Sequence, residues 1–492
     1  MKKMPVLFGI LFLFLFTGFG QVHDGNDTMV GVKKRKEVSQ YGITWTFDKP
    51  AITGKFITGD WWVIGPTEII KITPAPGPLT GEENTTIRLN QWGDTSLKMD
   101  SSMRNGSMIV LRVGNTQGYD SRNTSYRESD SVELPLYLKP NLSLISSISN
   151  TSLPVDNFCK NIMTDREKKS RVTLRAAAVL TCLDEVPPSD SLRPPYVGTE
   201  KPIYRAGDVC WNLFPRLEPV GEVPSWEEFE RYFQRPWIDH LMSWEQQELV
   251  PNENGPNYGR EHARIVSIAS LMLLMDVPVE RKETLTLGLI QRGIDLYGLA
   301  MTGGSWNEGG GHSSGRKWPI LFAGLMLGNS NLTDLPPTTF FQEDTQTYYG
   351  KGWFGQTALW QIIQHHGQRD TYEEKPPEQW EKWDKTSEGY RTCCTAVSWV
   401  GTALAARYMK AIGIWKHDAF FDYVDRWMRE DDPYREARGN HPRPKAETTT
   451  FDPFVTEMWK AYRKIAPEQE MSGVSLKFVW EGKRGKWIPN PK

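Results

Sequence analysis

Two polar loops carry the residue types from which a reaction centre could be built. The first, Asn252–Arg264, runs from an asparagine-rich segment into an expected helix that contains His262. Tyr258 lies four residues before His262, so the two side chains can share one face of a helix. A phenol and an imidazole placed in this way offer a proton donor and a proton acceptor. Asn257 and Arg260, beside them, can bind a carboxylate.

The second loop, Thr302–Trp318, is rich in glycine, which lets the backbone approach a ligand closely. It does not match a nucleotide phosphate loop, because Arg316 stands where that motif requires lysine and Lys317 where it requires serine or threonine. Aromatic, polar and charged residues between the glycines favour an anionic ligand: Trp306, Asn307, Glu308, His312, Arg316 and Lys317.

A third segment, Lys385–Cys394, places Tyr390 and Arg391 at the start of an apolar helix, where they can act as a proton donor and a carboxylate binder. The adjacent Cys393 and Cys394 are expected to be buried as small apolar residues. The five cysteines fit no zinc pattern, and no metalloprotease, calcium-loop or serine-hydrolase motif is present. We therefore expect no cofactor and no metal. One disulfide is compatible with the remaining cysteines: Cys159, Cys182 and Cys210.

The first 21 residues have the organisation of a secretion signal. Lys2 and Lys3 precede an apolar run, Val6–Phe16, and Gly18 and Gly20 supply small residues for cleavage. The run is too short for a permanent membrane span, which needs about 20 residues. No later segment is apolar enough to span a membrane. The sequence therefore predicts a secreted or periplasmic protein.

The elements that must position these loops fall into two parts, with a change in pattern near residue 155. Residues 22–155 show short alternating runs bounded by turn residues, which predict a β-sandwich. The expected strands are Gly42–Phe47, Trp61–Ile64, Glu68–Ile72, Ser107–Val113 and Ser131–Leu138.

Residues 156–471 show apolar positions three and four residues apart, the period of helices. The expected helices are Arg171–Leu183, Trp226–Trp244, Glu261–Met275, Arg281–Met301, Pro319–Leu327, Gln356–His365, Thr395–Ile412 and Asp418–Met428. Such a run packs economically as antiparallel pairs in an incomplete ring, an (α/α) toroid. The fold class is therefore α+β and multidomain. Residues 472–492 form a tail that can add a last strand.

Composition narrows the class of partner. The formal net charge is −2, so the chain lacks the basic field of a nucleic-acid-binding protein. It contains 20 tryptophans, whose flat apolar faces suit sugar rings. Together with export, this favours a polysaccharide as the partner.

One reaction uses histidine, tyrosine, arginine and asparagine without a nucleotide: β-elimination of a uronate-containing polysaccharide. The enzyme must neutralise the uronate carboxylate so that the proton on C5 becomes acidic enough to be removed. A base then takes this proton, and an acid protonates the departing glycosidic oxygen. Two alternatives remain open. A glycoside hydrolase would use two of Glu308, Glu261 and Asp239 as its carboxylates. A non-catalytic protein would only bind glycans.

The expected helical ring, the β-sandwich and the cleft residues together resemble the (α/α)-toroid polysaccharide lyases that act on alginate, heparin, hyaluronan, glucuronan or ulvan. In those lyases the β-domain usually follows the helices, whereas here it comes first. The resemblance implies His262 as the base, Tyr258 or Tyr390 as the acid, and Asn257, Arg260 and His312 as carboxylate neutralisers. The residues expected to bind substrate are Trp306, Asn307, Glu308, Arg316, Lys317 and Arg391.

Overall fold

The computed structural model describes residues 31–79, 103–123, 125–151, 162, 173–242, 246–307, 309–363, 369–429, 434, 450–465, 478–481 and 486–489. The predicted secretion signal and Cys159 lie outside these residues. Within them, no helix is both long and apolar enough to cross a membrane.

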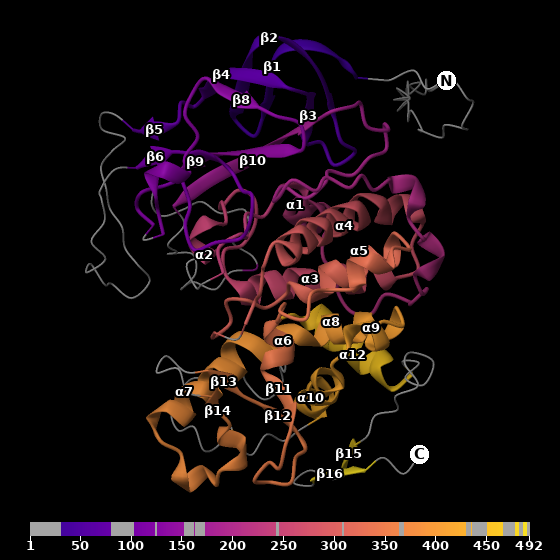
Figure 1. The fold of residues 1–492 in the computed structure, drawn as a ribbon. Coiled ribbons are helices and arrows are strands. Elements are labelled where there is room, and N and C mark those ends of the chain that lie inside the picture. The colour runs from indigo at the N-terminus through magenta and orange to yellow at the C-terminus, as the bar shows by residue number, and fades with distance from the viewer. Residues whose placement is uncertain are drawn as a thin grey trace, which may run out of the picture.

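An eight-stranded curled sheet forms the N-terminal part, at the top of Figure 1. One curled sheet thus takes the place of the two facing sheets of the predicted sandwich. Its order is β7-β9-β10-β3-β2-β4-β8, and β1 pairs with β2 at the side. The strands are β1 Lys33–Gln40, β2 Ile43–Lys55, β3 Trp61–Ile64, β4 Thr67–Thr73, β7 Ser107–Ile109, β8 Leu136–Leu138, β9 Leu142–Ser149 and β10 Leu174–Leu183, with a separate small pair of β5 Gly77–Pro78 and β6 Arg104–Asn105.

Strand β10 corrects a predicted helix and lies beyond the predicted end of the β-domain at residue 155. The sequence predicted a helix over Arg171–Leu183, but Leu174–Leu183 is an interior strand that pairs with β9 and β3. Ala176 and Ala178 belong to the core inside the curl, whereas Ala177 and Val179 pack against the helices. Because both faces are buried, the strand shows no alternation of polar and apolar residues. The sheet therefore extends past residue 155.

Helices follow the sheet in two groups (Figure 1). Helices α3, α4 and α5 lie next to the sheet, and α8, α10 and α12 lie beyond them. Helix α3 packs on α8, and α4 packs on α5. The helices are α1 Trp226–Gln234, α2 Gln246–Leu249, α3 Gly259–Leu274, α4 Val279–Met301, α5 Lys317–Met326, α6 Gln342–Thr345, α7 Lys382–Tyr390, α8 Ala396–Tyr408, α9 Ile412–Trp415, α10 Asp418–Arg429 and α12 Pro453–Tyr462.

The C-terminal part is not all helical, so the predicted toroid is not confirmed. Two hairpins lie where a helix over Gln356–His365 was predicted. Short apolar runs do not distinguish strand from helix by periodicity, which explains this error. The tail forms a further strand pair. These strands are β11 Thr347–Tyr349, β12 Ala358–Trp360, β13 Ile362–Ile363, β14 Arg369–Asp370, β15 Phe478–Glu481 and β16 Lys486–Pro489.

A buried ion triad joins the sheet to the helices. The guanidinium of Arg193 donates from Nε to Asp60, next to β3, at 2.7 Å and from Nη2 to Asp295 of α4 at 2.6 Å. All three side chains are nearly inaccessible to solvent. The side chain of Gln291 on α4 also holds the backbone of Arg193, donating to its carbonyl oxygen and accepting from its N–H. The triad therefore fixes where α4 lies beneath the sheet.

Replacing Arg193 tests this connection. We expect Arg193→Met to lower the free energy of unfolding by about 3–5 kcal/mol, because two buried carboxylates lose their common partner. Chemical denaturation of the purified chain measures the change. Arg205→Met, which removes a more exposed pair with Asp190, serves as the control and should cost under about 1 kcal/mol. Equal effects of the two substitutions would contradict a special role for the triad.

Candidate functional site

The glycine-rich loop lies directly against the start of α3. A Cβ at Gly259 would come within 2.1 Å of the carbonyl oxygen of His312. A Cβ at Gly311 would come within 2.4 Å of the carbonyl oxygen of Cys394. Only glycine permits backbones to approach this closely. Glycines from two loops thus bring together three segments that are far apart in the sequence.

The side chains of Tyr258, His312 and Tyr390 meet at this junction, and we call them the Tyr–His cluster. The rings of Tyr258 and His312 pack edge to face with centroids 5.2 Å apart. A Cβ at Gly310 would lie 3.1 Å from Cε1 of Tyr390 and 3.7 Å from Cδ2 of His312. The rings of Tyr390 and His312 therefore both lie next to Gly310. All three cluster residues are partly exposed to solvent.

Arg260, which is buried and paired with Glu261 at 2.8 Å, lies beside the cluster. Its guanidinium lies 5.5 Å from the ring centroid of Tyr258 and donates to the carbonyl oxygen of Cys393 at 2.8 Å. The phenol oxygen of Tyr258 accepts a hydrogen bond from the N–H of Gly311 at 3.0 Å. This hydrogen bond holds the phenol group of Tyr258 in place beside the glycine-rich loop. The junction is therefore suited to proton transfer through a phenol.

A disulfide between Cys393 and Cys394 borders the cluster within the π-helical turn Arg391–Thr395. The sequence predicted two buried, small apolar residues here; Cys394 is buried, but the two residues are bonded to each other. The bond joins adjacent residues, and Cys393 remains partly exposed. The disulfide therefore forms part of the surface next to Tyr390.

His262, predicted as the base, is buried behind the cluster. Its ring packs on Trp237 with centroids 4.3 Å apart, and Nε2 contacts the carbonyl oxygen of Pro256. Burial, followed by the charges of Arg316 and Arg292, holds the pKa of His262 well below its ordinary value. A side chain with no solvent exposure cannot reach a polymer, so the assignment as base is corrected.

Asn257, predicted to neutralise a carboxylate, is also buried. Its Oδ1 has no hydrogen-bond partner among the described residues. Asn257 directly precedes Tyr258, so it lies behind the cluster and not at its surface.

Four residues predicted to bind substrate are buried in structural contacts. Trp306 stacks on Phe341 with ring centroids 5.5 Å apart. The charges of the other three are neutralised in ion pairs: Arg316 with Asp239 at 3.0 Å, Lys317 with Asp344 at 2.5 Å and Arg391 with Glu388 at 2.7 Å. Asn307 is exposed, and Glu308 lies outside the described residues.

Two carboxylates considered for hydrolysis are also held in buried ion pairs. Asp239 contacts Arg292 at 2.7 Å and Arg316 at 3.0 Å. Burial disfavours the charge of Asp239, but Arg316 and Arg292 outweigh it and lower its pKa to about 2. Glu261 contacts Arg260 at 2.8 Å and is fully buried. Neither carboxylate is free to act on a sugar.

A carboxyl group beneath the glycine-rich loop was missed by the sequence analysis. Glu343 of α6 accepts the N–H of Gly315 at 2.6 Å and is buried. Burial raises its pKa to about 7. Nothing in the sequence indicated Glu343 as a functional residue, because Gln342–Thr345 is a single polar turn with no motif. Glu343 and its neighbour Gln342, which accepts the N–H of Ser313, support the loop from below.

No family model, curated protein or solved structure compared with this chain matches it. The proposal for its function therefore comes from the site alone.

The raised pKa of Glu343 gives a pH-dependent prediction. Its folded-state pKa of about 7 exceeds the ordinary value of 4.5, so its contribution to stability is complete below about pH 4.5 and is lost as the pH rises through 7. Glu343→Gln cannot ionise, so it should stabilise the protein relative to the parent chain at pH 8, by up to about 3 kcal/mol, and much less at pH 5. Thermal unfolding at both values measures this difference.

The exposed Glu283 of α4 provides the control. Glu283→Gln should give the same small change in melting temperature at both pH values. A Glu343→Gln effect that does not grow from pH 5 to pH 8 would contradict a buried, protonated Glu343.

Proposed function

We propose that this chain is a polysaccharide lyase that cleaves a uronate-containing anionic polysaccharide by β-elimination at the Tyr–His cluster. The observation that supports this most is the convergence of two phenols and one imidazole, from three distant segments, beside the guanidinium of Arg260. These are the groups that a proton abstraction followed by a proton donation requires. We further propose that the chain is exported, as its first 21 residues predict.

In this proposal His312 replaces His262 as the base. A neutral imidazole can accept the C5 proton, and His312 is partly exposed whereas His262 is not. Phenols ordinarily remain protonated at neutral pH, so Tyr390 or Tyr258 can donate a proton to the departing glycosidic oxygen. The exposed Asn307 is the candidate for neutralising the uronate carboxylate, because Arg260 is buried and paired with Glu261.

A glycoside hydrolase is less well supported. It needs two carboxylates about 5–10 Å apart across the sugar. Of the three candidates, Asp239 and Glu261 are engaged with buried arginines, and Glu308 lies outside the described residues. The tyrosines and His312 therefore favour elimination over hydrolysis.

Incubation with alginate, heparin, hyaluronan, glucuronan and ulvan tests the proposed reaction. Elimination leaves a 4,5-unsaturated product, so we expect near-ultraviolet absorbance to rise with at least one of these polymers. Tyr390→Phe and His312→Asn should each lower the rate by about 10²–10⁴-fold. Tyr137→Phe, which removes an exposed phenol from β8, is the matched control and should keep the parent rate.

The outcomes separate the three functions. Reducing ends without a rise in absorbance would replace elimination by hydrolysis, and polymer binding without either product would indicate a glycan-binding protein. His262→Gln should lower the melting temperature more than the rate of the folded fraction, since His262 is buried against Trp237. Loss of the reaction in folded His262→Gln would restore His262 as the base.

A further inference from the structure

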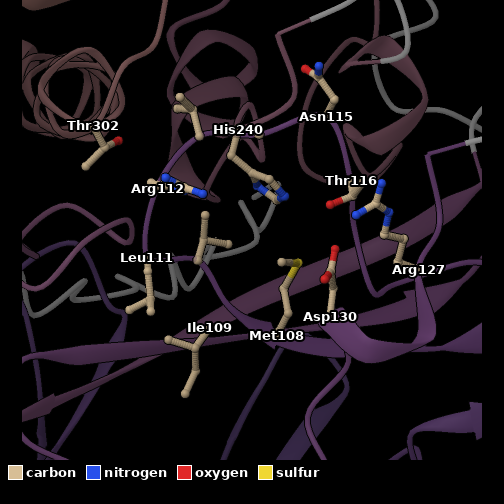
Figure 2. A pocket seen from close by; sticks show the side chains of 13 residues that line it. Met108, Ile109, Leu111, Arg112, Asn115, Thr116, Arg127, Asp130, His240 and Thr302 are labelled. Atoms are coloured by element: carbon tan, nitrogen blue, oxygen red, sulfur yellow. The ribbon is translucent and has the colours of Figure 1, made fainter.

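A second feature lies away from the Tyr–His cluster, where the sheet meets the helices. It is a pocket of about 640 Å³ lined by β7, by residues 110–116 that follow it, and by Arg127, Asp130, His240 and Thr302 (Figure 2). None of the pocket residues belongs to the cluster. The side chains that matter for the argument are Met108, Arg112, Arg127, Asp130 and His240.

His240 is a buried imidazole without a hydrogen-bond partner. Its side chain is 1% exposed, and neither Nδ1 nor Nε2 has a partner among the described residues. Figure 2 shows its ring directed into the space bordered by Thr116, Met108 and Asp130. Leaving both nitrogens unsatisfied destabilises the ligand-free fold. Residues kept at a cost to stability are expected at binding sites.

The chemical environment of His240 defines what it can bind. Its ring packs against Tyr119 and Tyr196, with centroids 5.8 and 6.5 Å away. Burial lowers the pKa of His240 to about 4, although the charges of Asp239 and Asp130 act in the opposite direction. The ring is therefore neutral at pH 7, with one nitrogen that donates and one that accepts, which matches a hydroxyl group.

Two guanidinium groups stand at the exposed edge of the pocket. Arg112 and Arg127 are exposed, and neither side chain forms an ion pair or hydrogen bond with any described residue. With Asp130 as the one carboxylate, the lining carries a formal charge of +1. Arginine binds a carboxylate through two parallel hydrogen bonds. One negative charge on the ligand thus balances the pocket.

We infer that this pocket binds a uronate residue of an anionic saccharide, separately from the reaction centre. The carboxylate would lie at one of Arg112 and Arg127, which stand on opposite sides of His240 in Figure 2, the hydroxyls at His240 and Asp130, and an apolar ring face on Met108. The volume lies within the range of pockets for small organic ligands. The choice of a uronate among small polar anions rests on the proposed function, but the presence of the site does not.

Calorimetric measurement of D-glucuronate binding to the full chain tests the inference. We expect saturable binding of glucuronate and at least tenfold weaker binding of glucose. His240→Phe keeps the ring volume and removes both nitrogens, so it should weaken glucuronate binding at least tenfold. The melting temperature of this variant without ligand should equal or exceed that of the parent chain. If His240 had only a structural role, His240→Phe would instead lower the melting temperature and leave the affinity for glucuronate unchanged.

Further variants locate the binding. Arg112→Gln combined with Arg127→Gln should weaken glucuronate binding at least tenfold and leave the fold intact, since both side chains are exposed. Arg216→Gln, another exposed arginine, should bind like the parent chain. His312→Asn should bind glucuronate at the pocket as the parent chain does.

The inference is overturned if the parent chain shows no saturable binding, if glucose binds equally well, or if His312→Asn abolishes binding while His240→Phe does not. Glucuronate binding tests the pocket, whereas product absorbance tests the proposed lyase activity. Failure of one can therefore be told from failure of the other. An active lyase without this binding would lack the second site, and binding without elimination would leave the site in place on a protein with another activity.

Discussion

One turn of helix α4 determines how the two parts of this molecule are held together. Arg292 and Asp295, three residues apart, point to different partners: Arg292 to Asp239 and Asp295 to Arg193. The first contact fixes the glycine-rich loop, because Asp239 also binds Arg316 at its end. The second fixes the sheet, because Arg193 also binds Asp60. Since removing one member of a buried ion pair leaves an uncompensated charge, this arrangement tolerates little change.

Both candidate sites adjoin this ionic layer. Asp239 is followed in sequence by His240, which borders the pocket, and Arg316 contacts the carbonyl oxygen of His312 in the cluster. The same layer explains why so many charges in the polar loops are structural. A buried guanidinium that is neutralised by a carboxylate cannot also bind a polymer. The partly exposed tyrosines, His312 and the unpaired arginines of the pocket are left for recognition and chemistry.

Local pattern was sufficient to place the bounds of some elements. The strand Trp61–Ile64 has the predicted bounds, and the helix Asp418–Arg429 differs from its prediction by one residue. Pattern failed where both faces are buried, as in Leu174–Leu183, because alternation then disappears. It also failed in short strands such as Ala358–Trp360, whose pairing with Thr347–Tyr349 depends on another segment.

The sequence by itself determined the residue types of the site: the phenols of Tyr258 and Tyr390, the imidazoles, and the glycines that let their loops approach one another. The tertiary structure decided which of these groups is accessible. It placed His312 at the surface and His262 in the interior, joined Cys393 to Cys394, and paired Arg391 with Glu388. The physical reason is that burial and ion pairing depend on partners distant in the sequence, whereas residue type and periodicity are local properties of the chain.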